Sequence, residues 1–95
     1  MNKIELILPA GNWNCLKAAV ENGADAVYLG IDKFNARRRA DNFKLEELRE
    51  VTKYAHQNGV KVYVTLNILI KNSEIEEFFQ TVKELYLAQV DAVII

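Results

Sequence analysis

Three consecutive arginines, Arg37–Arg39, are the residues of this chain whose type and spacing most directly suggest chemistry. Guanidinium groups stay charged at physiological pH and bind carboxylate or phosphate through two parallel hydrogen bonds. The arginines lie in a long connection between an apolar segment ending at Gly30 and a helical pattern starting at Leu45. Connections in α/β proteins usually have about 2–6 residues, and longer ones often carry the functional groups. We therefore expect a small anion or a peptide substrate here, with salt bridges to nearby acidic residues as the structural alternative.

Other polar residues lie where strands are expected to end. Gly11 and Asn12 precede a predicted helix, whose free backbone N–H groups are a ready anion site, and Asn12 also suits the cap of that helix. Asn67 can both donate and accept hydrogen bonds, and Tyr28 lies in a neighbouring predicted strand. An ordinary strand-to-helix turn and satisfied internal packing are the structural alternatives for these residues.

Three further residues are expected to be structural. His56 comes near the end of a predicted helix and should interact with the helix C-terminus and solvent. Cys15 is the only cysteine, which excludes an internal disulfide and suits the cytosol; we expect it to be semi-buried and discount a dyad with His56. Glu5 would be a general base only if buried, and a structural ion pair is favoured. No metal-ligand spacing, phosphate loop or nucleophile elbow is present, and no catalytic set can be identified.

The elements that must position these residues alternate regularly. Apolar patterns and caps predict strands at 4–8, 24–30, 60–69 and 91–95, and helices at 13–22, 45–58 and 73–86, with a Ser73–Glu76 capping box opening the last helix. This β-α-β-α-β-α-β order predicts an α/β fold with a parallel sheet and right-handed crossovers. The sequence Ala-Asp-Ala-Val at 24–27 is echoed by Val-Asp-Ala-Val at 90–93, which favours a barrel or a symmetric array.

The predicted strands have two unlike faces. Ile4, Leu6 and Leu8 share a face in the first strand, as do Val27 and Leu29 in the second and Val62, Val64 and Leu66 in the third. Doubly wound sheets tend to be apolar on both faces, whereas a barrel has helices only outside. We therefore predict half of a TIM-like (β/α)8 barrel, a fragment that comprises 1–95 and ends within a strand. The residues expected to point inward are Glu5, Tyr28, Tyr63, Thr65 and Asn67.

Composition sets the remaining limits. About half of the chain, 51%, is hydrophobic and the net charge is −1, so the chain is globular and is not a polyanion binder as a whole. No apolar run is long enough for a membrane span and the N-terminus lacks the layout of a signal peptide, so we expect a cytoplasmic protein without membrane contact.

Four motifs together resemble the N-terminal part of the peptidase U32 family, also described as collagenase-like proteases. They are Glu-Leu-Ile-Leu-Pro-Ala-Gly-Asn at 5–12, Asn-Gly-Ala-Asp-Ala-Val-Tyr-Leu-Gly at 22–30, Phe-Asn-Ala-Arg-Arg-Arg-Ala-Asp-Asn-Phe at 34–43 and Val-Tyr-Val-Thr-Leu-Asn at 62–67. The resemblance implies a TIM-like barrel and either a protease or a factor that hydroxylates RNA or quinone precursors. It also implies that iron–sulfur clusters, where members have them, are held by cysteines later in the chain, so none is expected within these residues.

The same resemblance sharpens the candidate residues. Arg37 and Arg39 fall where the family carries arginines, whereas Arg38 occupies a position that is usually small. Lys44 replaces a Ser-like helix cap, and Gln89 stands where a glycine normally ends the third helix, which predicts a strained or frayed corner. The predicted substrate- or anion-binding set is Arg37, Arg39, Asn67, Gly11, Asn12 and Tyr28.

Three functions remain open from the sequence. The first is the N-terminal fragment of a U32-type protease that is inactive alone. The second is part of an RNA-hydroxylation factor of the same family, with RNA as a partner of the complete protein. The third is a non-catalytic α/β fragment that binds an anion. A homodimer through an exposed sheet edge, or through the face that carries Tyr63, is expected unless a longer chain covers these surfaces.

Overall fold

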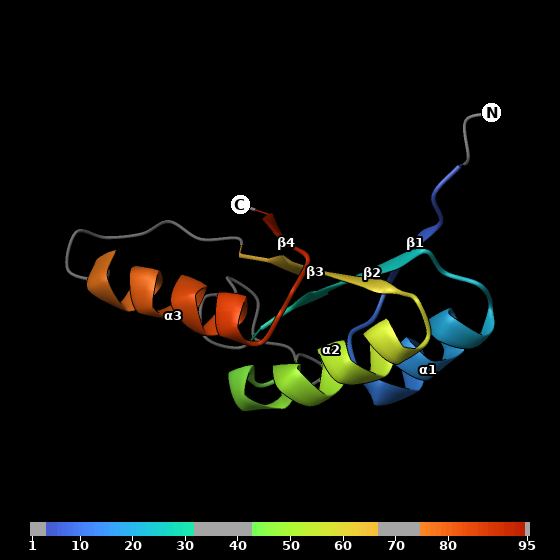
Figure 1. Cartoon of the computed structure of the whole chain (residues 1–95), viewed down its shortest axis with the longest axis horizontal. Coiled ribbons are helices and arrows are strands. Elements are labelled where there is room, and N and C mark those ends of the chain that lie inside the picture. The colour runs from blue at the N-terminus through green and yellow to red at the C-terminus, as the bar shows by residue number, and fades with distance from the viewer. Residues whose placement is uncertain (1–3, 32–42, 67–74, 95) are drawn as a thin grey trace.

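The computed structural model describes residues 4–31, 43–66 and 75–94. In chain order the elements are β1 (Ile7–Pro9), α1 (Trp13–Glu21), β2 (Ala26–Gly30), η1 (Leu45–Glu47), α2 (Leu48–Gln57), β3 (Lys61–Thr65), α3 (Ile75–Leu87) and β4 (Ala92–Ile94). The strands form one sheet in the order β1-β2-β3-β4, and every neighbouring pair is parallel (Figure 1). The predicted α/β fold with a parallel sheet is therefore confirmed.

All three helices lie on the same side of this sheet (Figure 1). The aliphatic faces predicted for β2 and β3 are buried beneath them, at Val27, Leu29, Val62 and Val64. Each helix contributes fully buried side chains to the same core: Leu16 from α1, Leu48, Val51 and Ala55 from α2, and Leu85 from α3. The strands are neighbours in space in the same order as in the sequence, and crossover connections are right-handed. Each connecting helix therefore lies on the same face of the sheet.

The predicted bounds of the first strand were wrong. Ile4 is 90% exposed and Leu6 is also exposed, because ladder pairing with β2 begins only at Ile7. Leu6 instead bonds to Asp25, whose backbone N–H and side-chain carboxylate take the place of a regular strand partner. β3 is shorter than the predicted 60–69: it ends at Thr65, and 67–69 lie outside the described residues.

The three helices end in the same way. In each, the N–H of the residue after the C-cap donates to the carbonyl three residues earlier, and the N–H of the following residue donates to the carbonyl five residues earlier. The two donors are Gly23 and Ala24 in α1, Gly59 and Val60 in α2, and Gln89 and Val90 in α3. This is the Schellman motif, which needs a left-handed residue. Gly23 and Gly59 have φ values of 85° and 72°, and Gln89 has a φ of 66°. The strained corner predicted at Gln89 is thus present, and it is not frayed.

Two helix starts have side-chain caps. Asn12 Oδ1 accepts a hydrogen bond from the N–H of Cys15 at 2.8 Å, as predicted for the N-cap of α1. Before η1, the N–H of Lys44 donates to Glu47 Oε1 at 3.0 Å, so the acidic residue compensates for the missing Ser-like cap. Ser73 of the predicted capping box lies outside the described residues.

Candidate functional site

Most of the candidate site residues come from segments that follow the carboxyl ends of the strands. β1 leads into Gly11 and Asn12, while β2 continues into buried Ile31, which forms a parallel bridge with buried Phe43. Leu66 follows β3 and donates its N–H to the carbonyl of Ile94 in β4, at 2.8 Å. Arg37, Arg39 and Asn67 themselves lie outside the described residues, so their roles stay predictions.

An aromatic cluster secures the point at which the arginine segment rejoins the fold. Trp13, the first residue of α1, meets Phe43 edge-to-face with ring centroids 5.6 Å apart, and Tyr54 of α2 at 6.2 Å. Such pairs add about 0.5–1.5 kcal/mol beyond the burial of their area. Because Phe43 also bridges to Ile31, both ends of the arginine segment are held at the core.

The face of the sheet without helices carries the polar and aromatic residues predicted to point inward. Tyr28 and Tyr63 are direct partners in the register of β2 and β3, and Tyr28 is 41% exposed. Thr65, one step nearer the carboxyl edge, donates its hydroxyl to the carbonyl of Leu29 at 3.3 Å. The predicted division into an aliphatic covered face and a mixed open face is confirmed for these strands. Whether another copy covers this face stays a prediction.

Glu5 forms an ion pair. It precedes β1, and its carboxylate pairs with the ammonium of Lys61 at 3.8 Å, with both side chains about half exposed. Lys61 shares the face of β3 that carries Tyr63 and Thr65, so this pair leaves the inward orientation of Glu5 a prediction. The structural ion pair favoured from the sequence is confirmed.

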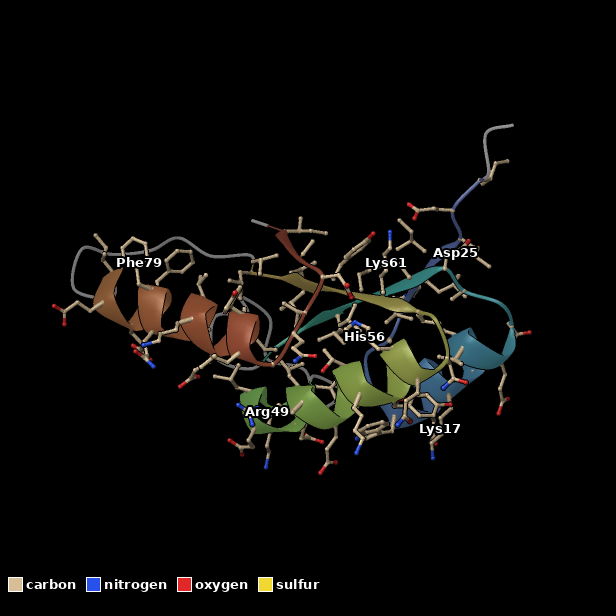
Figure 2. The ribbon with its side chains drawn as sticks, in the orientation of Figure 1. Lys17, Asp25, Arg49, His56, Lys61 and Phe79 are labelled. Atoms are coloured by element: carbon tan, nitrogen blue, oxygen red, sulfur yellow. The ribbon has the colours of Figure 1, made fainter. Side chains whose placement is uncertain are left out.

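His56 has a partner that the sequence reasoning missed. Its Nε2 lies 2.7 Å from Asp91 Oδ2, and the ring projects from α2 toward the strands (Figure 2). The same Asp91 oxygen accepts the backbone N–H of Val62 at 2.7 Å. The echo between 24–27 and 90–93 was the available signal, because Asp25 makes the matching bond to Leu6.

Metal-ligating side chains are scattered among the described residues. No group of three or more His, Cys, Asp or Glu residues that could hold a metal occurs among them. Cys15 is exposed on α1, and it is the only cysteine of the chain. An iron–sulfur cluster generally needs four cysteine ligands, so this chain does not fit as its holder. Within residues 4–31, 43–66 and 75–94, no helix has the length and apolar character to cross a bilayer.

The comparisons with known proteins agree with the motifs. Residues 11–95 match the model of peptidase family U32. The chain is 42% identical over its full length to "Uncharacterized protease MJ0090" of Methanocaldococcus jannaschii, of which it covers 23%. It is 42% identical over 98% of its length to "tRNA hydroxylation protein P1" of Bacillus subtilis, covering 22% of that protein.

The name of a third relative refers to a different kind of RNA. It is "23S rRNA 5-hydroxycytidine C2501 synthase" of Escherichia coli, 37% identical over 99% of this chain, which covers 14% of it. The chain therefore spans less than a quarter of the length of these relatives. The match across 11–95 and the four ordered motifs lead to the same conclusion: the chain belongs to peptidase family U32.

Proposed function

We propose that this chain is the N-terminal part of a protein that hydroxylates RNA. The observation that carries the proposal is the 42% identity to a tRNA hydroxylation protein, extending over nearly the whole chain. The 37% identity to an rRNA 5-hydroxycytidine synthase supports the same reaction on a second kind of RNA. The segment common to these proteins would then serve the hydroxylation of RNA in general, with the choice of RNA made elsewhere.

The chain is proposed to form the first half of a (β/α)8 barrel. Sequential strand order, helices on one face only and an open face with paired tyrosines all favour this architecture over a doubly wound sheet. Barrel enzymes carry their sites at the carboxyl ends of the strands. The proposed substrate-binding residues follow the strands in the chain, at Gly11, Asn12, Arg37, Arg39 and Asn67, or lie in β2, at Tyr28.

Their proposed roles follow from their chemistry. The two arginines would pair with phosphate, and Asn67 would orient a polar base or sugar through its amide. Exposed Tyr28 offers an aromatic surface on which an unstacked base can lie. The remaining barrel strands and any iron–sulfur cluster would come from residues beyond this chain, so these 95 residues would not catalyse alone. We place the protein in the cytoplasm, where its RNA substrates occur.

A peptidase is the second candidate. It is favoured by the family name and by the 42% identity to an archaeal protein named as a protease. Gelatin cleavage by the complete protein, lost in Arg37→Ala or Asn67→Ala, would support it. The third candidate, a non-catalytic anion binder, requires a saturable thermal shift with phosphate or a dicarboxylate that Arg37→Ala abolishes.

The deciding experiment is mass spectrometry of total RNA nucleosides from cells with and without the gene. Loss of a hydroxylated nucleoside on deletion, restored by the intact gene, is the expected result. An unchanged nucleoside profile would overturn the RNA proposal and return weight to proteolysis.

A further inference from the structure

We infer that the groove between α2 and the end of α3 binds the phosphate backbone of RNA. This groove has a volume of about 590 Å³ and is separate from the carboxyl edge of the sheet. Arg49, Lys53 and His56 of α2 line one side, and Leu87 and Gln89 line the other. The inference rests on the proposed function for its choice of RNA as the ligand, and it adds a docking surface on the outer, helical side of the fold.

Two basic side chains and one histidine of α2 line the groove. Arg49, Lys53 and His56 are spaced at i, i+4 and i+7, which aligns them along one side of a helix over about 10.5 Å. Figure 2 shows Arg49 at the start of α2 and His56 near its end. Glu50 of the same helix does not belong to the groove lining that the structure describes. The two cations Arg49 and Lys53 on one helical side suit successive phosphates.

Arg49 and Lys53 are available to a ligand. Within the described residues, neither Arg49 nor Lys53 forms an ion pair, and both side chains are exposed. Arg49 also stands in the first turn of α2, where the helix dipole favours an acidic residue. His56 is held by Asp91 at 2.7 Å, so we assign phosphate pairing to Arg49 and Lys53 alone.

The opposite wall offers Gln89 in an unusual backbone conformation. It is the non-glycine residue with positive φ in the described part of the chain, at 66°, where the other two helices use glycine. A left-handed residue with a Cβ is strained, and strain of this kind clusters at functional sites. A glycine would relieve the strain but would remove the carboxamide, which can donate a hydrogen bond to a phosphate oxygen.

The carbonyls at the end of α3 and two nearby carboxylates affect where a phosphate can bind. The carbonyls of Leu85, Tyr86 and Ala88 at the end of α3 already accept hydrogen bonds from Val90, Gln89 and Thr52, which weakens the negative end of this helix. Glu46 and Glu84 line a separate hollow of about 270 Å³ that Arg49 also borders. Their carboxylates disfavour phosphate there and direct it into the larger groove.

The test measures binding of a fluorescein-labelled, unmodified tRNA transcript to the complete protein by anisotropy at several KCl concentrations. Replacing Arg49 and Lys53 together by glutamine should weaken binding about a hundredfold or more at low salt, since the loss of each charged partner corresponds to about tenfold or more. It should also lower the salt slope by about 1.4–1.8, the value for two phosphate contacts. The matched control replaces exposed Lys17 and Lys83, which lie outside the groove, by glutamine and should leave both quantities unchanged.

Gln89→Gly separates binding from folding. It should raise stability and still weaken RNA binding, a combination that unfolding cannot produce. Unchanged binding in the Arg49–Lys53 variant, equal loss in the control, or absence of RNA binding by the wild-type protein would overturn the inference. Competition by poly-glutamate as strong as that by unlabelled RNA would assign the groove to an acidic protein and overturn the inference as well.

Normal RNA binding by the groove variants, with loss of a hydroxylated nucleoside on gene deletion, would refute the groove alone. An unchanged nucleoside profile would refute the proposed function instead.

Discussion

Asp25 and Asp91 make the same two hydrogen bonds at the starts of two different strands. The N–H of Asp25 donates to the carbonyl of Leu6 at 2.8 Å, while Asp25 Oδ2 accepts the N–H of Leu6 at 2.8 Å. Asp91 repeats this arrangement on Val62, with distances of 2.8 and 2.7 Å. Each carboxylate thus accepts a backbone N–H of the neighbouring chain segment and fixes the register of its own strand, β2 against β1 and β4 against β3.

Removing the Asp91 carboxylate should destabilise the fold. In Asp91→Ala, the N–H of Val62, a residue whose side chain is fully buried, loses its acceptor, and His56 loses its partner. We expect a loss of about 1–3 kcal/mol in the free energy of unfolding, measured by urea titration. His56→Ala is the control and should lose less, because the bond to Val62 remains. Equal losses in the two variants would contradict a separate role for the backbone bond.

Gln89→Gly should stabilise the protein. Glycine adopts positive φ without the steric penalty, and the gain is offset in part by the greater freedom of glycine in the unfolded chain. We expect a net increase of about 0.5–1 kcal/mol in the free energy of unfolding.

Gly59→Ala is the reciprocal control for Gln89→Gly. A Cβ built on Gly59 meets no atom within 4 Å, so its expected loss of about 1 kcal/mol reports the backbone conformation alone. A destabilising Gln89→Gly would show that packing of the glutamine side chain outweighs the strain.

Thr52→Val tests the contact between α2 and the end of α3. The Thr52 side chain is buried and its hydroxyl donates to the carbonyl of Ala88, the C-cap of α3, at 2.7 Å. Valine has nearly the same shape and leaves that carbonyl without its donor, so we expect a loss of about 1–3 kcal/mol in thermal or urea unfolding.

Thr81→Val is the matched control for Thr52→Val. Buried Thr81 donates to the carbonyl of Glu77, four residues earlier in its own helix, which the helical N–H ladder already satisfies. Its loss should be clearly smaller, and a larger one would argue against Thr52 as the cap of α3.

Under the proposed function, Arg37→Ala should abolish or strongly reduce RNA hydroxylation by the complete protein. Losing one bidentate guanidinium contact corresponds to about tenfold or more in binding. The matched control is Arg38→Ala, which removes the same charge from the next position and should leave the hydroxylated nucleoside near its normal level. Complementation of the deleted gene with each variant, followed by nucleoside mass spectrometry, distinguishes the two. Equal effects would show that the segment acts only through its total charge.

The sequence by itself determined the order of elements and the parallel sheet, because both depend on local apolar periodicity and chain connectivity. The buried faces of β2 and β3 followed from alternation at Val27, Leu29, Val62 and Val64. The N-cap at Asn12 was predictable because caps depend on residues close together in the chain, whereas the strained corner at Gln89 was predicted from the family resemblance. The first strand was misplaced because apolar alternation continues through Ile4 and Leu6, and alternation does not reveal where a partner strand begins.

Only the tertiary structure brought together residues distant in sequence. The pairing of His56 with Asp91 joins residues 35 positions apart, and the cap of Thr52 on Ala88 joins residues 36 apart. The groove between α2 and the end of α3 exists only because the crossovers bring these segments together, so that Gln89 lines the same groove as Arg49 and Lys53. Local pattern specifies each element and its buried face, but the distances between side chains on different elements are set by the packing of the whole core.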